Sequence, residues 1–368
     1  MGWGSEFGKL LFSLVKRLRH LQKASVESSL DILNQGSKVK SLFMRDFLTI
    51  SAILFSLAVS AAGEKWRFER ELMATRFAIV CYADDQSMAE KAAEAAFVIV
   101  AQINTIASDY LPESELSKIS GKSVGKPIEL SPRLYDLLDK SRGFAESTNG
   151  AFDPTLAPLT KLWRETRNIK HLPSLEKLKA ARASVGWYHF TLDSKTQSIT
   201  LLRENMAFDL GGIAKGYAAD LMIESLAAAG ISQSMIAAGG DIRLGDPPPG
   251  RDGWHVAVQT FDLKRRDEIL VLSNAAVSTS GDLHQSVEID GVKYSHVLNP
   301  ATGLGLTQRI AATVIADRAT LSDPLATAAC VMGPDASEKL KRLPGVRDVK
   351  IRTLQEVPAD LDSKIPAN

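Results

Sequence analysis

Short apolar stretches joined by very short connections limit the folds open to this chain more than any other feature. Between residues 190 and 316, β-forming residues gather repeatedly. The predicted strands are 190–192, 199–202, 234–237, 254–259, 268–272, 287–289 and 311–316. Parallel neighbours need crossovers of a dozen or more residues, whereas Asp290-Gly291 is a two-residue hairpin signal. We therefore expect an α+β fold with largely antiparallel sheets and packed helices, and not a doubly wound parallel sheet.

The region before these strands predicts one further strand and two long helices. β-Forming residues dominate 73–83, and apolar residues recur at helical spacing over 86–108. Ser131 followed by Pro132 is a typical helix start, and Asn149-Gly150 is a helix stop.

Composition narrows the class of partner and of metal site. The 44 basic and 43 acidic side chains almost cancel, which gives no electrostatic support for a nucleic-acid partner. The only two cysteines, Cys81 and Cys330, lie far apart and without metal-ligand spacing. This pattern excludes a disulfide scaffold and a zinc site. Whether the two cysteines pair with each other depends on the distance between them.

An uncharged apolar run over 47–62 predicts export. Basic residues precede the run, small residues end it, and it is short for a bilayer span of about 20 residues. We therefore expect 44–62 to be a signal peptide or a membrane tether; the alternative is a buried core helix. No cysteine follows that could carry a lipoprotein anchor. The expected location is the periplasm, either free or tethered to the inner membrane through this N-terminal segment.

The apolar run also divides the chain. Residues 1–43 form an extension that signal peptides do not normally carry, and Met44 stands directly before the run. Either Met44 is the true start, or the extension is an unusual one. After the run, no linker rich in proline, glycine or serine interrupts the chain. We expect one domain over 63–352 and a flexible tail over 353–368.

The stretch FDLGGIAKGYAADLM, residues 208–222, carries the most chemical information. We expect a strand that ends in Asp209, a turn at Gly211-Gly212, and a helix that starts near Ile213. Paired glycines let the backbone approach a ligand, and N–H groups at a helix start suit an anion such as a pyrophosphate. Lys215 would reach back to a phosphate. The alternative is a tight turn with no ligand.

A second stretch, TLSDPLATAACVMG, places Asp323 and Thr327 four residues apart in a predicted helix with Ser322 as its N-cap. This spacing puts both oxygen-bearing side chains on one face. A carboxylate and a hydroxyl suit Mg²⁺, which prefers oxygen ligands and takes few carboxylates. The alternative is that Asp323 caps the helix and Thr327 bonds to its own backbone.

Other segments offer single candidates. His296 is predicted to end a strand, just before a turn that Asn299-Pro300 begins and Gly303 closes. Tyr110, in a loop, could stack on a planar ring, and Asp241 could pair with Arg243.

Taken together and in order, these segments resemble the ApbE family, the FAD:protein FMN transferases. The resemblance extends from about residue 73 to residue 349. The matching motifs are Met73-Ala74-Thr75, 108–110 with Ser114-Glu115, 151–155, 209–217, 238–241, 279–281, 296–303 and 323–327. The departure is Asn299, where the family has Asp. Turn formation tolerates this change, but any charge role there is in doubt.

The resemblance implies an ApbE-like fold with the flavin in a cleft between strands and helices. The residues implied to contact FAD are Met73, Tyr110, Ala151, Phe152, Asp153, Asp209, Lys215 and Val297. Those implied to hold Mg²⁺ are Gly212 through its carbonyl, Asp323, Thr327 and, to a lesser degree, Ala326.

The implied activity is Mg²⁺-dependent transfer of FMN from FAD to a Thr or Ser hydroxyl of an acceptor protein, with release of AMP. We expect Asp323 to act through the metal and His296 to be the general base for the hydroxyl. Tyr110 and Phe152 would flank the flavin ring, and Asp209 would either orient Lys215 or bind the flavin. Two alternatives remain: an FAD pyrophosphatase that yields FMN and AMP, and a non-catalytic exported flavin-binding protein.

Overall fold

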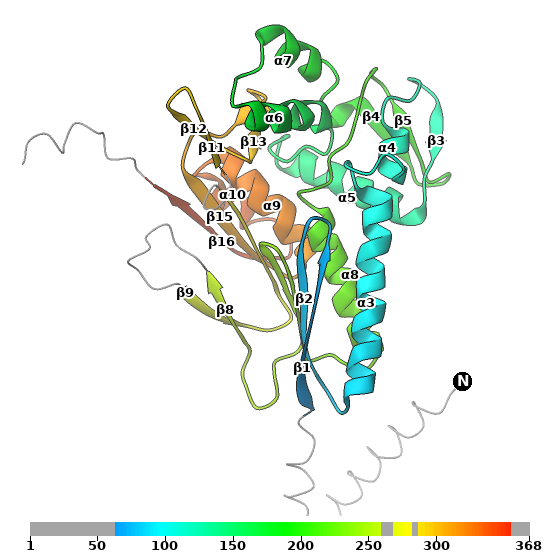
Figure 1. Ribbon diagram of the computed structural model, residues 1–368, viewed down its shortest axis with the longest axis vertical. Helices are drawn as coiled ribbons and strands as arrows, with labels where there is room; N and C mark the ends of the chain where they lie inside the picture. Colours follow the sequence, from blue (N-terminus) through cyan, green and yellow to red (C-terminus); the bar gives the residue numbers. More distant parts are fainter. Residues whose placement is uncertain (1–62, 259–267, 282–285, 355–368) are drawn as a thin grey trace, which may run out of the picture. The chain divides into compact units, whose positions relative to one another are not determined.

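In the computed structural model, which describes residues 63–258, 268–281 and 286–354, a seven-stranded sheet organises the chain (Figure 1). Its strand order is β1-β2-β6-β7-β10-β15-β16, and every neighbouring pair is antiparallel. The strands are β1 (Glu64–Leu72), β2 (Thr75–Ala83), β6 (Ser234–Ala238), β7 (Asp241–Leu244), β10 (Ala276–Gly281), β15 (Ile310–Ala316) and β16 (Val346–Thr353).

The smaller sheets are antiparallel as well. One has the order β3-β5-β4, and the others are the pairs β8-β9, β11-β12 and β13-β14. Their strands are β3 (Pro127–Glu129), β4 (Phe190–Asp193), β5 (Ser198–Leu201), β8 (Trp254–Val258), β9 (Glu268–Leu272), β11 (Ser286–Ile289), β12 (Val292–Ser295), β13 (Leu298–Asn299) and β14 (Leu304–Gly305). The predicted α+β class and antiparallel pairing are confirmed, and all of the strands predicted between residues 190 and 316 occur within one residue of their expected ends.

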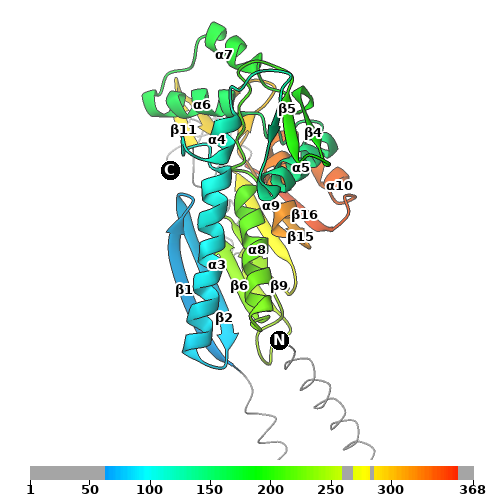
Figure 2. The same cartoon turned by 90° about the vertical axis from the view of Figure 1, so that its right-hand side faces the viewer.

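Three long helices, α3, α8 and α9, pack on one face of the main sheet (Figure 2). The helices are α3 (Gln86–Ala107), α4 (Glu115–Ile119), α5 (Pro132–Ser147), α6 (Ala157–Ile169), α7 (Leu175–Arg182), the 3-10 helix η1 (Trp187–His189), α8 (Ala214–Ala228), α9 (Ala319–Met332) and α10 (Ala336–Leu340). Ser131 caps α5, as predicted, by accepting a hydrogen bond from the Leu134 N–H.

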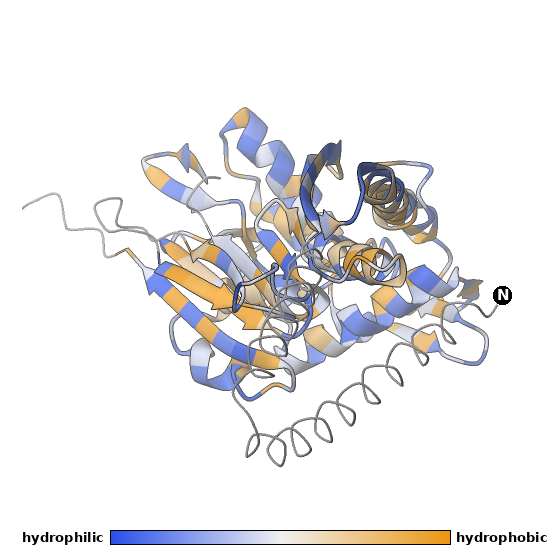
Figure 3. Ribbon diagram, turned by 90° about the horizontal axis from the view of Figure 1, so that it is seen from below, coloured by the Kyte–Doolittle hydropathy of each residue, from blue (hydrophilic) through white to orange (hydrophobic). Residues whose placement is uncertain are grey.

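Alternation along the strands gives the main sheet two buried faces. Phe77 and Ile79 of β2 point into the core shared with α3 and α8. Val80, the residue after Ile79, faces the other side of the sheet and packs with Trp254 and Val256 of β8. Figure 3 shows hydrophobic and hydrophilic residues interleaved along the strands. The β8-β9 pair therefore covers the face that the helices leave open.

The strand predicted over 73–83 begins two residues later than expected. Leu72 pairs with Thr75, so Met73 and Ala74 are the two-residue loop of the β1-β2 hairpin. Both have positive φ values, 50° and 55°, a conformation that only glycine and a few polar residues adopt without strain. β1 was not predicted from the sequence, because its residues are mostly charged and exposed.

Several predictions concern residues that the structure does not describe. The extension 1–43, the segment 44–62 and residues 355–368 lie outside the described ranges. β16 ends at Thr353, one residue beyond the expected domain end. Among the residues described, no helix is both long and apolar enough to cross a membrane. Cys81 and Cys330 form no disulfide, and both are buried.

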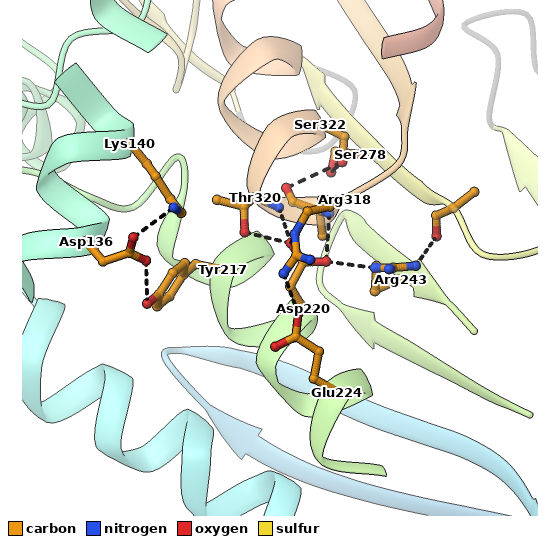
Figure 4. A network of polar contacts seen from close by, with 12 residues as sticks. Asp136, Lys140, Tyr217, Asp220, Glu224, Arg243, Ser278, Arg318, Thr320 and Ser322 are labelled. Atoms are coloured by element: carbon orange, nitrogen blue, oxygen red, sulfur yellow. Dashed lines mark hydrogen bonds and ion pairs between the residues drawn. The ribbon is translucent and has the colours of Figure 1, made fainter. Parts of the chain in front are cut away.

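A buried carboxylate on α8 fixes the position of two neighbouring elements (Figure 4). Asp220 accepts hydrogen bonds from the N–H groups of Ala319 and Thr320 at the start of α9, at 3.1 and 2.8 Å. It also accepts one from Arg243 Nε of β7, at 2.7 Å. The expected pair between Asp241 and Arg243 is therefore wrong. Asp220 instead joins α8, α9 and β7.

Candidate active site

A cavity of about 890 Å³ brings together segments that are far apart in the sequence. It lies among the β1-β2 loop, the loop after α3, α6, the start of α8, β7, β10, the segment after β12, and α9. The sequence-derived site residues that line it are Met73, Tyr110, Ala151, Phe152, Asp153, Asp209, Gly212, Lys215, His296, Val297, Asp323 and Thr327. Ala326 does not line the cavity, because its side chain is fully buried in the α9 core.

The start of α8 is shaped by glycines and by Asp209. No strand precedes Asp209, contrary to expectation; its N–H donates to the Pro154 carbonyl, and its carboxylate accepts from the Gly211 N–H at 2.9 Å. Gly216 lets α8 approach α9 closely, since a Cβ there would lie 2.3 Å from the Ala319 carbonyl oxygen. This approach lets the Gly216 N–H donate to Asp323 Oδ2 at 3.1 Å.

Helix α9 starts earlier than its sequence suggests. The N-cap position is Arg318, and Asp323 and Pro324 lie inside the helix. Ser322 is not the cap; its hydroxyl is buried and bonds to the hydroxyl of Ser278 at 2.7 Å. The predicted spacing still places Asp323 and Thr327 toward the same cavity.

Lys215 stands at the centre of a buried charged cluster. Its Nζ lies 3.2 Å from Asp241 Oδ2, 3.4 Å from Asp323 Oδ2 and 3.1 Å from the Gly211 carbonyl oxygen. Burial lowers the pKa of Lys215, but the charges of Asp241 and then Asp323 outweigh it and raise that pKa above its ordinary value. Lys215 therefore remains a cation, with two carboxylates around it.

The carboxylates carry the excess charge of this cluster. Burial and then the charge of Asp241 raise the pKa of Asp323, although Lys215 opposes them. Asp241 Oδ2 is buried and has no aligned hydrogen bond, despite the nearby ammonium. Sequence reasoning noted Asp241 but gave it the wrong partner; its place directly after the Gly239-Gly240 turn was the available signal.

This oxygen-rich cluster, with two carboxylates around one ammonium, fits a small hard cation. Thr327 Oγ1 lies 3.2 Å from Ser280 Oγ, and a Cβ on Gly212 would lie 3.5 Å from Thr327 Oγ1, so the Gly212 backbone is adjacent. The described residues contain no group of three or more His, Cys, Asp or Glu that could hold a metal. The carboxylate and hydroxyl oxygens present are of the kind that Mg²⁺ prefers, since this ion takes one or two carboxylates and completes its shell with water and phosphate oxygens.

Tyr110 contributes an aromatic ring to the lining of the cavity. Tyr110 is 69% exposed, and the guanidinium of Arg164 lies over its ring at 4.0 Å. Arg164 also pairs with Asp109 and with Asp209, the latter at 3.2 Å. Asp209 therefore orients Arg164, and not Lys215 as one expectation had it. Sequence reasoning missed Arg164, which lies in a helix without any recognisable motif.

The remaining aromatic and acidic candidates are more deeply placed. Phe152 is buried and packs edge-on against Phe144, with the ring centroids 6.5 Å apart. Asp153 is also buried, which raises its pKa, and it accepts hydrogen bonds from Thr155 and from the Trp187 N–H. Its contacts brace the cavity wall.

The segment after β12 carries His296 to the cavity. Asn299 forms the predicted turn: its Oδ1 accepts from the Ala301 N–H at 2.9 Å, and its carbonyl accepts from the Gly303 N–H at 2.8 Å. Gly303 closes the turn with a φ of 73°. The turn that follows His296 thus needs only the polar oxygen of Asn299, and not a negative charge.

Comparison with known proteins shows which sequences and folds this chain resembles. A Vibrio cholerae protein called FAD:protein FMN transferase is 32% identical over 244 residues, which cover 64% of this chain and 72% of that protein. The crystal structure of the ApbE protein from Thermotoga maritima is similar with a TM-score of 0.71 and 30% identity, over 79% of this chain and 94% of that one. The crystal structure of the apo form of the Pseudomonas stutzeri flavinyl transferase ApbE is similar with a TM-score of 0.69 and 27% identity, over the same shares of the two chains.

The family model agrees with these likenesses. The model described as the ApbE family matches residues 73–349, which is well over half of the chain. The matched range includes every lining residue of the cavity, from Met73 in the β1-β2 loop to Thr327 in α9. The resemblance inferred from the sequence is confirmed, and the chain belongs to the ApbE family.

Proposed function

We propose that this chain is a flavin transferase, which takes the FMN half of FAD and attaches it through its phosphate to a protein. Family membership and the likeness to proteins called FAD:protein FMN transferase support this function. The observation that carries it is the cavity in which the exposed ring of Tyr110 and the charged cluster around Lys215 occur together. A flavin needs a surface on which its ring can stack, and a diphosphate needs cations and oxygen-bound metal, so one cavity serves both ends of FAD.

The finer part of the proposal is a dependence on Mg²⁺. Asp323 and Thr327 would hold the ion, together with the Gly212 carbonyl. When bound, Mg²⁺ would neutralise charge on the phosphates and on the departing AMP. Lys215 adds a fixed positive charge at the same place, because the pair of carboxylates keeps it protonated.

The residues proposed to contact FAD divide between its two ends. Met73, Tyr110 and Phe152 supply apolar and aromatic surface, whereas Asp209 and Lys215 supply polar groups. The other proposed contacts are Ala151, Asp153 and Val297. Because Arg164 covers one face of Tyr110, the ring would stack on the flavin with its other face.

The acceptor group is proposed to be a Thr or Ser hydroxyl. Its oxygen would form a bond to the phosphorus of the FMN half as the bond from that phosphorus to the AMP oxygen breaks. AMP leaves with the bonding electron pair, and the hydroxyl proton passes to His296. An imidazole suits this task because its ordinary pKa is near neutrality, and His296 lines the same cavity as Lys215.

One incubation tests the function against its alternatives. The protein is mixed with FAD, Mg²⁺ and an acceptor protein that carries Thr or Ser, and a denaturing gel is inspected for flavin fluorescence. We expect a fluorescent acceptor band and stoichiometric AMP. FMN and AMP without a fluorescent band would identify a pyrophosphatase. FAD recovered intact, although bound, would identify a flavin-binding protein and refute transfer. Replacement of the acceptor Thr or Ser by Ala must abolish the band.

We also propose that the protein acts outside the cytoplasm, either free in the periplasm or tethered to the inner membrane. The support is the apolar run over 47–62 with its basic flank and small-residue end. The expected mature N-terminus is near Ala62 or Gly63. N-terminal sequencing of protein from fractionated native cells tests this location, and recovery of the intact N-terminus from the cytoplasmic fraction would refute it.

A further inference from the structure

The segment from α6 to the end of α7 is far more basic than the rest of the chain. Residues 157–182 contain seven lysines and arginines against two acidic residues, whereas the whole chain has 44 basic and 43 acidic side chains. The remaining residues of the chain, with 37 basic and 41 acidic side chains, are slightly acidic on balance. Figures 1 and 2 show them together at one end of the described unit.

Most of these cations have no counter-charge within the described part of the chain. Arg164 alone among them forms an ion pair, with Asp109 and Asp209. The others, which we call the basic surface, are Lys161, Arg167, Lys170, Lys177, Lys179 and Arg182. All are exposed or half-buried. A surface rich in cations without ion pairs favours an acidic partner that supplies the missing charge.

An apolar groove borders the basic surface at Lys179 and Arg182. Its volume is about 490 Å³, and its walls include Leu175, Leu178 and Leu304, with Lys179 and Arg182 beside them. Leu175 is 84% exposed, and Ile169 at the end of α6 is 62% exposed. An apolar pocket with cations at its rim suits an apolar side chain that acidic residues flank. Nucleic acid fits this pocket less well, because it offers no such apolar anchor.

Two connections join the groove to the active-site cavity. Helix α6 packs against α7 and lines the cavity with Arg164 and Arg167, so Arg167 belongs both to the cavity and to the basic surface. The segment after β12 carries His296 at the cavity and reaches Leu304 at the groove. A polypeptide that lies along this segment and α6 would run from the groove to the proposed general base.

We propose that the basic surface and its groove dock the acceptor protein, and that the acceptor presents an acidic segment with one apolar anchor. This proposal rests on the proposed transfer of FMN to a protein. The groove takes the anchor, the cations take the acidic residues, and the hydroxyl to be modified enters the cavity beside His296. The surface thus selects which Thr or Ser is modified, while the cavity performs the chemistry.

The test uses three synthetic peptides that share one Thr and one Leu and differ only in acidic, neutral or basic flanking residues. Binding is measured by fluorescence anisotropy of labelled peptide without FAD, and transfer is measured with FAD and Mg²⁺. Wild type should bind the acidic peptide most tightly, and its affinity should fall as salt is raised. The variant Lys177→Gln/Lys179→Gln/Arg182→Gln should weaken that binding and raise KM about tenfold, with kcat unchanged.

Matched variants separate docking from general charge and from folding. Lys91→Gln/Lys339→Gln/Arg342→Gln removes three exposed cations of α3, α10 and the residues just after α10 that have no ion pair within the described structure, and should change nothing. Leu175→Ser should weaken all three peptides alike, since it removes the anchor site. All variants should keep the wild-type affinity for FAD.

The outcomes are distinguishable. Equal binding of the acidic and basic peptides, or equal effects of the two triple variants, would overturn the docking proposal. Binding to vesicles of phosphatidylcholine and phosphatidylglycerol, but not to the acidic peptide, would assign the surface to a membrane and overturn it as well. Charge-dependent peptide binding without any transfer would support docking while it refutes the proposed function.

Discussion

Asp323 makes several contacts in the charged cluster. It accepts a hydrogen bond from the Gly216 N–H, pairs with Lys215 and faces the cavity. Asp323→Asn keeps the shape of the side chain and removes its charge. If this carboxylate holds Mg²⁺, FMN transfer should fall at least about a hundredfold, the scale of losing one electrostatic contact to a transition state. FAD affinity should change little, since the aromatic contacts remain.

A Mg²⁺ titration with EDTA as the zero point measures this effect, and circular dichroism checks that the variant is folded. Thr327→Val gives a second, uncharged probe of the same site and should raise the half-saturating Mg²⁺ concentration. Wild-type transfer that persists in EDTA, or full activity of the Asn variant, contradicts the metal assignment.

Among the connections between elements, the one made by Asp220 has the clearest energetic consequence. Its buried carboxylate supplies the N-terminal hydrogen bonds of α9 and pairs with Arg243 of β7. Asp220→Ala should lower the free energy of unfolding by about 3–5 kcal/mol, because it leaves the largely buried guanidinium of Arg243 without its carboxylate partner. Urea denaturation measures this change.

Glu224→Gln is the matched control for that variant. Glu224 pairs with the exposed Arg318 at the edge of the same network, so its loss should cost under about 1 kcal/mol. Equal costs for the two variants would show that Asp220 does not hold α9 in place.

The β1-β2 hairpin offers the opposite kind of change, one that relieves strain. Ala74 has a φ of 55°, and an L-residue with a side chain pays about 1–2 kcal/mol for the left-handed region. Ala74→Gly should therefore stabilise the protein by about 0.5–1 kcal/mol, after the added entropy of the unfolded chain is deducted. Denaturant midpoints test this, and Gly143→Ala, a change in the opposite direction within α5, serves as the comparison. A destabilised Ala74→Gly variant would mean that the loop is unstrained.

Over the whole molecule, elements that depend on neighbouring residues could be predicted from the sequence, whereas features that depend on distant contacts could not. The seven strands predicted between 190 and 316 and the helix starts at 86 and 132 follow from periodicity and capping, which act within a few residues, whereas β7 and β10 of the main sheet were not predicted. The start of α9 was misplaced because its N-terminal hydrogen bonds go to Asp220, about a hundred residues away. The sequence shows no trace of that bond.

The site divides in the same way. Motifs identified twelve of the residues that line the cavity, since a motif specifies residue types together with their spacing. They did not reveal that Arg164 covers Tyr110, or that Asp241 shares Lys215 with Asp323, because these contacts join separate elements. β1 was missed for another reason: it is an exposed edge strand, and its mostly charged residues do not have the composition typical of a strand.

Because the cavity is built from segments between Met73 and Thr327, its ligands should stabilise the whole described unit and not one element. FAD at a hundred times its Kd should add about 2.7 kcal/mol to the free energy of unfolding. Mg²⁺ should add a further increment only when FAD is present, since phosphate oxygens complete its shell. Urea midpoints with FAD, with Mg²⁺ and with both give these increments. In Asp323→Asn the FAD increment should persist and the Mg²⁺ increment should vanish. An equal Mg²⁺ increment in the variant and in wild type would place the ion elsewhere.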